Sequence, residues 1–189
     1  MIISGNNIKL KPAKLSDRKN IYLWLAKSDL TPSMMGLPIY PYNPVPTWRE
    51  FCKDYNKSFF SGYGNKKGRN FIIFVQDFEI GTLGYDLMNI DKKIVLLDIW
   101  LRAEKYCGLG YGSDALITLC NYLNQKYGIK DFYISPSFRN KRAIAAYTKS
   151  GFKKIQMKQT DAKRKFGVDI FDYNDNIVMK KDLDPKNSD

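Results

Sequence analysis

The sequence predicts an α/β fold in which a mixed, mostly antiparallel sheet is flanked by helices. Three strand-like runs, at residues 71–76, 81–88 and 94–101, are separated by short gaps, and such gaps favour antiparallel hairpins. Helical and strand patterns then alternate towards the end of the chain, which gives a mixed sheet with helices packed on its faces. We expect a single domain over residues 1–183, followed by a polar tail at 184–189.

The N-terminal third predicts one strand and two helices, with a proline-rich segment between the helices. An alternating run precedes Pro12, and Ser16-Asp17 is a helix start signal before apolar residues at helical spacing. Five prolines within residues 31–47 stop both a helix and a central strand, so a long ordered loop or lid is expected there. The expected elements are a strand at 8–11, a helix after Asp17, the loop at 31–47, a helix at 48–60 and a glycine-rich turn at 61–69.

The second half of the chain contains the clearest helix in the sequence. Leu116, Leu119 and Leu123 recur on one face of it, and Gly128 ends it. Gly151 ends a further helix in the same way. The expected elements are a helix at 110–127, a strand at 131–135, a helix at 141–150, a strand at 152–157, a polar insertion at 158–174 and a last strand at 177–180.

Composition favours a folded cytoplasmic protein. Hydrophobic residues make up 44% of the chain, too many for a disordered one, and no apolar run approaches the ~18 residues needed to cross a bilayer. The first residues lack the apolar block of a signal peptide, and an odd number of cysteines, 3, argues against a secreted disulfide scaffold. The formal charge of +12 attracts anions such as phosphates or nucleic acid, although a solvated basic surface also explains it.

The sequence contains no histidine. This absence excludes Ser-His-Asp and Cys-His catalytic triads, histidine-based zinc sites and histidine general bases, and we expect no metal. Any proton transfer must therefore be carried out by Asp, Glu, Tyr, Lys, Cys or water.

A glycine-rich loop joins the strand at 94–101 to the helix at 110–127. Gly108, Gly110 and Gly112 tolerate a positive φ and let the backbone approach a ligand closely. The free N–H groups of the first helical turn and the helix dipole make a site for a phosphate or pyrophosphate. The alternative is a turn that only lets the helix pack on the sheet. Neither a Walker loop nor a dinucleotide loop fits, because no Gly-Lys-Ser/Thr follows and the preceding strand is not the first of a βαβ unit.

Two segments resemble the GNAT N-acetyltransferase superfamily. The first, similar to the family's acyl-CoA pyrophosphate loop Arg/Gln-x-x-Gly-x-Gly/Ala, runs Cys107-Gly108-Leu109-Gly110-Tyr111-Gly112-Ser113. The second, which resembles the more specific pattern Asn-x-x-Ala-x-x-x-Tyr-x-Lys-x-Gly-Phe, runs Asn140-Lys141-Arg142-Ala143-Ile144-Ala145-Ala146-Tyr147-Thr148-Lys149-Ser150-Gly151-Phe152. Their order and separation, and the strand pattern over nearly the whole chain, are also similar to this family. Within it, the chain resembles aminoglycoside 6′-N-acetyltransferases and ribosomal-protein acetyltransferases.

The resemblance implies an enzyme that transfers an acetyl group from acetyl-CoA to a primary amine, by direct attack on the thioester. It also implies that a backbone N–H of Trp100 or Leu101 holds the acetyl carbonyl oxygen. Cys107 stands where the family usually carries Arg or Gln, and Ser135 stands where aminoglycoside enzymes often carry Asp. The cofactor-binding residues implied by the resemblance are Trp100, Leu101, Cys107, Gly108, Leu109, Gly110, Tyr111, Gly112, Ser113, Asn140 and Tyr147.

Two residues are candidates for the catalytic proton transfers. The resemblance implies Tyr147 as the acid, since a phenol with a pKa of ~10 can protonate a thiolate with a pKa of ~8.5. Tyr147 could instead only pack its helix on the sheet. Asp98 interrupts an apolar strand, where a buried charge is costly unless it is paired. It could receive the amine proton or hold an ammonium group, or it could contact a lysine or the backbone at a strand edge.

The acceptor site is expected between the loop at 31–47 and the insertion at 158–174. The candidate residues are Asp98, Trp24, Tyr40 and Asp175, with Tyr42, Trp48, Asp169 and Asp172 as further ones. Each has a structural alternative, because aromatic residues are more often in the core and such acids are more often solvated.

The leading functional hypothesis is acetylation of a primary amine on a small molecule, with an aminoglycoside-like antibiotic, and so antibiotic resistance, as one candidate. A protein N-terminus, such as that of a ribosomal protein, is the alternative acceptor, and the charge of +12 suits it better. The third hypothesis is a non-catalytic module that binds acyl-CoA or nucleic acid, although no nucleic-acid motif supports it. We expect a monomer or homodimer without a membrane partner. An acidic pocket beside the cofactor would favour a cationic small molecule, whereas an open basic groove would favour a macromolecule.

Overall fold

The structure of the chain is a computed structural model that describes residues 1–34, 45–61, 68–89, 94–167, 170–171 and 175–183. Several sequence-based expectations fall outside these residues. They are most of the proline-rich loop with Tyr40 and Tyr42, most of the glycine-rich turn, the acidic residues Asp169 and Asp172, and the polar tail.

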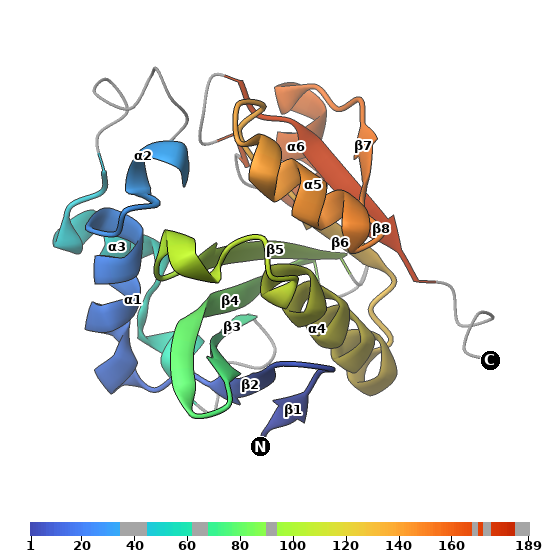
Figure 1. The fold of residues 1–189 in the computed structure, drawn as a ribbon. Coiled ribbons are helices and arrows are strands. Elements are labelled where there is room, and N and C mark those ends of the chain that lie inside the picture. Colours follow the sequence, from blue (N-terminus) through green and yellow to red (C-terminus); the bar gives the residue numbers. More distant parts are fainter. Residues whose placement is uncertain (35–44, 62–67, 90–93, 168–169, 172–174, 184–189) are drawn as a thin grey trace.

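Within the described residues, eight strands form one sheet in the order β1-β2-β3-β4-β5-β6-β8-β7 (Figure 1). Every neighbouring pair is antiparallel except β5 and β6, which are parallel, so the mixed, mostly antiparallel sheet predicted from the sequence is confirmed. The strands are β1 Ile3–Ser4, β2 Lys9–Pro12, β3 Gly68–Val75, β4 Phe78–Asn89, β5 Ile94–Leu101, β6 Asp131–Ile134, β7 Lys153–Ile155 and β8 Val178–Asp182.

Six α-helices are found in the described part of the chain. They are α1 Arg18–Ala26, α2 Thr31–Met34, α3 Trp48–Asp54, α4 Tyr111–Tyr127, α5 Lys141–Lys149 and α6 Gln159–Phe166, with short 3-10 turns at Leu15–Asp17, Lys57–Phe60 and Glu104–Tyr106. Gly128 ends α4 in a left-handed conformation with φ of 64°, as the sequence predicts.

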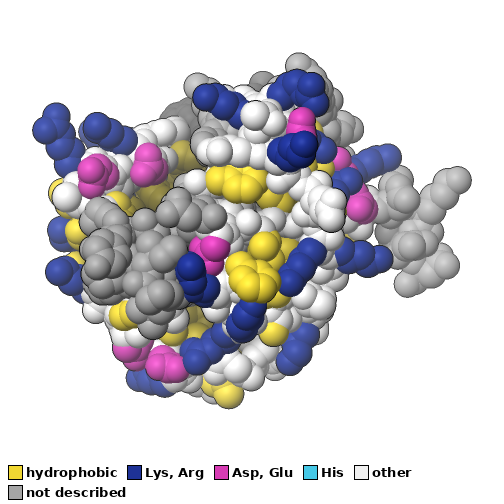
Figure 2. Space-filling model, turned by 90° about the horizontal axis from the view of Figure 1, so that it is seen from above, with side chains coloured by type: hydrophobic (Ala, Val, Ile, Leu, Met, Phe, Trp, Pro, Cys, Tyr) yellow, Lys and Arg dark blue, Asp and Glu magenta, His cyan; other side chains and the backbone are white. Residues whose placement is uncertain are grey.

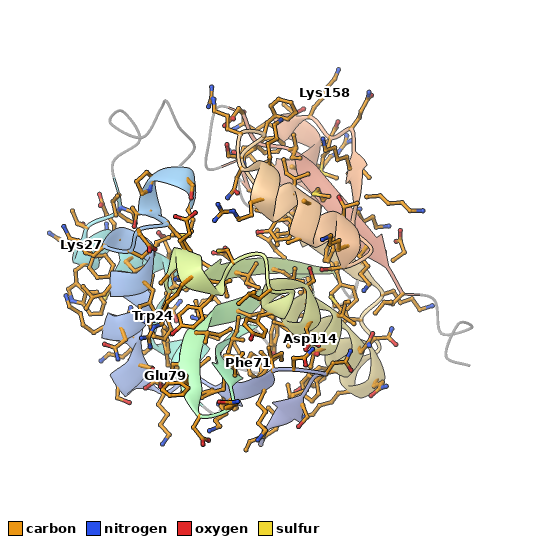
Figure 3. The ribbon with its side chains drawn as sticks, in the orientation of Figure 1. Trp24, Lys27, Phe71, Glu79, Asp114 and Lys158 are labelled. Carbon is orange, nitrogen blue, oxygen red and sulfur yellow. The ribbon has the colours of Figure 1, made fainter. Side chains whose placement is uncertain are left out.

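Helices cover both faces of the sheet. Side chains alternate between the two faces along each strand, and each face carries apolar side chains that a helix buries. α4 and α5 pack on one face, in a core that includes Phe71 from β3 and Val95 from β5 (Figures 1 and 3). On the other face, α1 and α3 bury Ile72 and Trp100, and α6 buries Tyr133 nearer the C-terminus. The end of β5 therefore lies between two groups of helices.

β5 and β6 separate part-way along their length. Their parallel register pairs Ile94 with Asp131 and Leu96 with Tyr133 and stops there, whereas β5 continues beside β4 to Leu101. Residues 97–101 of β5 thus have a paired strand on one side only. The opening left by β6 lies directly before the glycine loop, and it positions the site described below.

Two element predictions were wrong in detail. The helix expected at 48–60 ends at Asp54, and a separate turn follows Asn56, whose side chain accepts a hydrogen bond from the Ser58 N–H at 2.9 Å. The polar insertion at 158–174 contains α6, which was missed because its sequence is mostly polar and only Ala162 and Phe166 are buried.

Two short elements were also missed in the N-terminal part. The proline-rich segment opens with the helical turn α2, in which Pro32 occupies the first turn, where a helix tolerates proline. The two-residue strand β1 pairs with β2. Its following loop is tied to α4, because Asp114 accepts the N–H groups of Asn6 and Asn7 at 3.1 and 2.6 Å (Figure 3).

Candidate active site

The glycine loop leaves open space at the start of α4. Gly108 and Gly110 adopt left-handed conformations, with φ of 76° and 83°, and Gly110 directly precedes the first turn of the helix. A Cβ added to either glycine would meet no atom within 4 Å. The first N–H groups of a helix have no carbonyl partner within it, so they are available at this open space. The residues present therefore fit a phosphate or diphosphate group.

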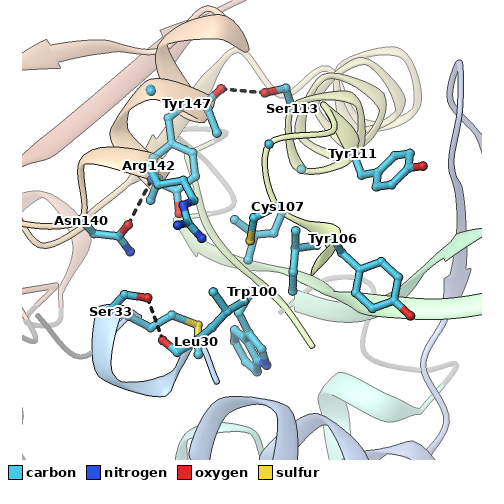
Figure 4. Close-up of a pocket in the computed structure, with 18 of the residues that line it drawn as sticks. Leu30, Ser33, Trp100, Tyr106, Cys107, Tyr111, Ser113, Asn140, Arg142 and Tyr147 are labelled. Carbon is cyan, nitrogen blue, oxygen red and sulfur yellow. Dashed lines mark hydrogen bonds between the residues drawn. The ribbon is translucent and has the colours of Figure 1, made fainter. Parts of the chain in front are cut away.

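A cavity of about 230 Å³ lies beside this loop, between α5, α2 and the end of β5 (Figure 4). It brings together every cofactor-binding residue predicted from the sequence except Leu109, whose side chain is 59% exposed and does not line it. The predicted residues in its wall are Trp100, Leu101, Cys107, Gly108, Gly110, Tyr111, Gly112, Ser113, Asn140 and Tyr147.

Two cations that the sequence analysis did not single out also line this cavity, Arg142 and Lys149. Arg142 lies beside Cys107 (Figure 4), and its Nη2 donates a hydrogen bond to Glu104 Oε1 at 2.8 Å. Both side chains of this ion pair are more than half exposed, so the pair contributes little to stability and Glu104 can be exchanged for another anion. The sequence feature that could have identified Arg142 as a cavity residue is its position two residues after Asn140, in the first turn of α5.

Tyr147 is held in place by the packing of α5 on α4. Asn140 caps α5 by accepting the Ala143 N–H at 3.1 Å, and the Ser113 hydroxyl of α4 donates to the Ala146 carbonyl at 3.0 Å (Figure 4). The Tyr147 side chain is only 8% exposed, and what remains exposed lines the cavity.

A second cavity of about 370 Å³ adjoins the first. Both are lined by Met34, Ile99, Trp100, Asn140 and Tyr147, so they meet at the Tyr147 and Trp100 side chains. The first cavity extends from this meeting point to the glycine loop, and the second extends to α3 and Asp98. Two compounds bound in the two cavities would therefore face each other at Tyr147.

The second cavity is acidic although the chain is basic. Its wall contains Asp54 and Asp98, and no Lys or Arg among the described residues. Figure 2, by contrast, shows Lys and Arg side chains over much of the face seen from above, both at its margin and beside the hydrophobic side chains nearer its middle. The sign of the charge in this cavity is thus opposite to the formal charge of +12 of the whole chain.

Asp98 points to the same face of the sheet as Trp100, the face that α1 and α3 cover. The hydroxyl of Tyr55, the residue after α3, donates a hydrogen bond to Asp98 Oδ2. A capping box positions α3, because the Thr47 N–H donates to Glu50 Oε2 at 2.8 Å and the Glu50 N–H donates to Thr47 Oγ1 at 3.3 Å.

Asp98 has a pKa above the ordinary value of an aspartate. Solvent reaches its side chain through the cavity, but the surrounding protein hinders solvation of a charge there, and this burial raises the pKa. Hydrogen bonds from the Tyr55 hydroxyl and the Ile99 N–H lower the pKa and offset part of that rise. A carboxylate with a raised pKa accepts a proton more readily than an ordinary one.

Other residues proposed from the sequence lie outside both cavities. Trp24 packs on the core beneath α1 and α3, and Trp48 stacks in the same aromatic group (Figure 3). Asp175 forms an ion pair with Arg139 at 3.0 Å and accepts the Ser137 hydroxyl at 2.9 Å. The sequence analysis missed Asp54 and Tyr55 as cavity residues, because it placed both in the middle of a continuous helix.

Two further findings concern only the residues that the structure describes. No group of three or more His, Cys, Asp or Glu side chains lies close enough together to hold a metal ion. No helix is long and apolar enough to cross a membrane.

Residues 7–153, which include the glycine loop and α5, match the family model of the acetyltransferase (GNAT) domain. A comparison with curated protein sequences gave no match.

Solved structures share the fold at low sequence identity. An acetyl transferase from Salmonella typhimurium that modifies the N-terminal serine of 50S ribosomal subunit protein L7/L12 has a TM-score of 0.72 and 19% identity, over 97% of this chain and 100% of that chain. AAC(6′)-Ib in complex with paromomycin and acetyl-CoA has a TM-score of 0.68 and 17% identity, over 94% of each chain. The microcin C7 self-immunity acetyltransferase MccE, in complex with acetyl-CoA and AMP, has a TM-score of 0.65 and 18% identity, over 94% of this chain and 93% of that chain.

Proposed function

Because the chain belongs to the GNAT acetyltransferase family and is an acetyl-CoA-dependent N-acetyltransferase, we propose that its acceptor is a primary amine on a small cationic molecule. The observation that carries this proposal is the acidic second cavity, which meets the glycine-loop cavity at Tyr147. Acidic side chains are in the minority in this chain, 19 against 31 basic ones. The wall of the second cavity nevertheless contains two of them and no basic residue among those described, and this arrangement favours a bound cation. An aminoglycoside-like antibiotic is one compound of this class, as in the fold relative AAC(6′)-Ib.

The glycine loop and the start of α4 are proposed to hold the diphosphate of coenzyme A. The open space beside Gly108 and Gly110 supports this assignment, as do the N–H groups of the first turn of α4, which have no carbonyl partner within the helix. Arg142 would supply from α5 the positive charge that Cys107 does not supply from the loop. When bound, acetyl-CoA supplies an acetyl group activated as a thioester.

Leu101 is proposed as the backbone donor to the acetyl carbonyl oxygen, in preference to Trp100. The Arg102 N–H donates to the Ile80 carbonyl at 2.9 Å, so it points towards β4. Because N–H directions alternate along a strand, the Trp100 N–H also points towards β4, and the Leu101 N–H points to the opening that β6 leaves. A donor fixed in this way stabilises negative charge on an oxygen.

Asp98 and Tyr147 are proposed for the two proton transfers. Asp98 accepts the proton of the attacking amine, directly or through water, and its raised pKa suits that task. Tyr147 holds a proton on its hydroxyl at neutral pH and donates it to the departing sulfur. The two cavities meet at Trp100 and Tyr147, so both transfers would take place at this junction.

A protein N-terminus is the second candidate acceptor. The many Lys and Arg side chains on the face seen in Figure 2 favour it, because a basic surface attracts an acidic partner. The fold relative that modifies ribosomal protein L7/L12 acts on an acceptor of this kind.

Thiol release from acetyl-CoA, measured with a panel of acceptors, tests the proposal. The panel contains small amines, diamines, amino sugars with several amines, and peptides with a free N-terminus. We expect turnover with the small cationic amines and little with the peptides. Turnover with peptides alone would replace the proposal by its alternative, and no turnover with any acceptor would remove both.

A further inference from the structure

A row of three residues crosses the sheet beside Asp98. The strand registers place Asn70 of β3 opposite Gly84 of β4, and Gly84 opposite Asp98 of β5, so all three face the same side. Gly84 has no side chain, and the Asn70 side chain occupies the space above it, since a Cβ at Gly84 would lie 2.2 Å from Asn70 Oδ1. The Asn70 side chain therefore lies over Gly84, and both residues line a hollow that also includes Asp98.

This hollow has a volume of about 180 Å³ and adjoins the proposed acceptor cavity. The two spaces share Asp54, Tyr55 and Asp98 in their walls. The hollow adds a third carboxylate, Asp86 of β4, and again contains no Lys or Arg among the described residues. In the part of the chain that the structure describes, Asp86 has neither an ion-pair partner nor a hydrogen-bond donor.

Asn70 provides independent evidence that the hollow is a binding site. Its side chain is 1% exposed and lines the hollow, and its Nδ2 group has no hydrogen-bond partner among the described residues. An unsatisfied buried donor costs about 1–3 kcal/mol, so such groups are rare unless something binds to them. An amide N–H₂ donates to an oxygen, and a carboxylate attracts a cation. A ligand that carries both groups would satisfy both residues.

We propose that this hollow is a second subsite for the acceptor, in which Asp86 binds an additional ammonium group and Asn70 binds a neighbouring hydroxyl oxygen of the same molecule. The acceptor is then an amino alcohol or amino sugar with at least two amines. The inference rests on the proposed function, because it assumes that the amine to be acetylated lies at Asp98. A metal ion is a poorer fit, since the described carboxylates do not form a group that could hold one.

The strand register predicts how far apart the two amines are. Asp86 pairs with Leu96, and Asp98 is two residues further along β5 on the same face. The Cα atoms of diagonal neighbours of this kind are roughly 7–8 Å apart. The preferred acceptor should therefore carry two nitrogens separated by roughly that distance.

Burial of Asp86 without a partner raises its pKa to about 6. The other titratable groups that line the hollow are Asp54, Tyr55, Tyr85 and Asp98, from α3 and its end and from β4 and β5, and none of them is basic. The folded state then holds the Asp86 proton more tightly than the unfolded chain does, so the stability of the fold falls as the pH rises from about 4 to about 6. Because the ionised Asp86 carboxylate lowers the stability of the fold at neutral pH, its presence at this position is better explained by a role in ligand binding than by a role in folding.

The test compares KM values for a series of diamines of graded length with those for monoamines of the same carbon skeletons. In the wild-type protein, we expect the diamine with a nitrogen separation of roughly 7–8 Å to have a KM at least about tenfold lower than its monoamine. In Asp86→Asn we expect this advantage to fall to about twofold or less, because the second ammonium group of the diamine loses its carboxylate while the monoamine has no such group. Asp77→Asn is the matched control, because Asp77 lies exposed at the other end of the same hairpin and its loss changes the net charge equally.

Thermal unfolding provides the second measurement. At pH 7 the midpoint for Asp86→Asn should be higher than that for the wild type, and the difference should shrink below about pH 5. A lower midpoint, or failure of this variant to fold, would show a structural carboxylate and overturn the subsite. Equal KM values for monoamines and diamines in the wild type would overturn it too, while leaving the proposed function intact. No turnover with any amine would instead contradict the proposed function itself.

Discussion

Tyr147 is a buried residue of α5 that lines both cavities, and its hydroxyl is the group proposed to donate a proton to the departing sulfur. We expect Tyr147→Phe to lower kcat by about 100-fold, in the range typical of a lost general acid. The dissociation constant of CoA should change by less than about threefold, because the ring that packs near Phe152 and lines the cavity is kept. Steady-state kinetics and calorimetry with CoA give the two values.

Tyr122→Phe is the control for Tyr147→Phe, since Tyr122 lies on α4 outside both cavities and also loses only a hydroxyl. Its kcat should equal that of the wild type. An unchanged kcat in Tyr147→Phe would remove this residue from the mechanism and leave it a packing role only.

Tyr55 sets the pKa of Asp98 through its hydrogen bond. That bond favours the ionised carboxylate and so lowers the pKa, against the rise that burial causes. Tyr55→Phe should therefore move the acid limb of the pH profile of kcat/KM to higher pH, with a larger loss of activity at pH 6 than at pH 8. Asp54 is the other ionisable group in the wall of this cavity besides Tyr147, and it stays in place in the variant. A limb that moves to lower pH, or does not move, would argue against Asp98 as the base.

At the level of single residues, the sequence indicates side chains that break a local pattern. Asp98 was predicted because it interrupts an apolar strand, and Tyr147 because it lies in a specific motif. Asn70, Gly84 and Asp86 were not predicted as a group, since their proximity comes from strand register and not from spacing along the chain. Register depends on the assembled sheet, so one sequence does not reveal it.

The glycine loop before α4 gives an element-scale test of the cofactor site. A residue with a Cβ at Gly110 would be strained in its left-handed conformation, at a cost of roughly 1 kcal/mol. The Cβ would also enter the open space beside the helix N–H groups. We expect Gly110→Ala to weaken CoA binding by about tenfold or more, as measured by calorimetry.

Gly167→Ala separates this loss of binding from strain. Gly167 follows α6 with φ of 79°, and a Cβ there would also meet no atom within 4 Å, but it lies away from the cavity. Both variants should lose a similar free energy of unfolding, whereas only Gly110→Ala should bind CoA less tightly. If Gly110→Ala and Gly167→Ala bound CoA with equal affinity, the loop would not hold the diphosphate.

Elements with a strong periodic pattern were predicted almost to the residue. β5 has the bounds that its apolar run predicts, and α4 begins one residue later than expected. α6 and the end of α3 were wrong for a physical reason: α6 is held by the burial of Ala162 and Phe166 against a surface that only the folded chain provides. The break after α3 depends on the cap at Asn56, and the same break places Tyr55 beside Asp98.

At the scale of the whole molecule, the distribution of charge affects the two proposed ligands differently. The formal charge of +12 attracts an anion such as CoA from a distance and repels a cationic acceptor. Among the residues that the structure describes, the carboxylates of the second cavity and its adjoining hollow, Asp54, Asp86 and Asp98, oppose that repulsion. The basic composition was read from the sequence as favouring a macromolecular acceptor, because composition gives the net charge and not its distribution.

Added salt should therefore affect the two ligands differently. Between about 0.01 and 0.1 M NaCl the screening distance falls from about 30 to about 10 Å, which removes most of the long-range attraction of CoA to the basic surface. We expect the dissociation constant of CoA to rise several-fold over this range. The KM of a diamine should change much less, because its attraction to the acidic cavity and its repulsion by the net charge are screened together. An acidic peptide acceptor would behave like CoA, so a KM for peptides that is low at 0.01 M salt and rises in parallel with the CoA constant would favour the protein N-terminus as the acceptor.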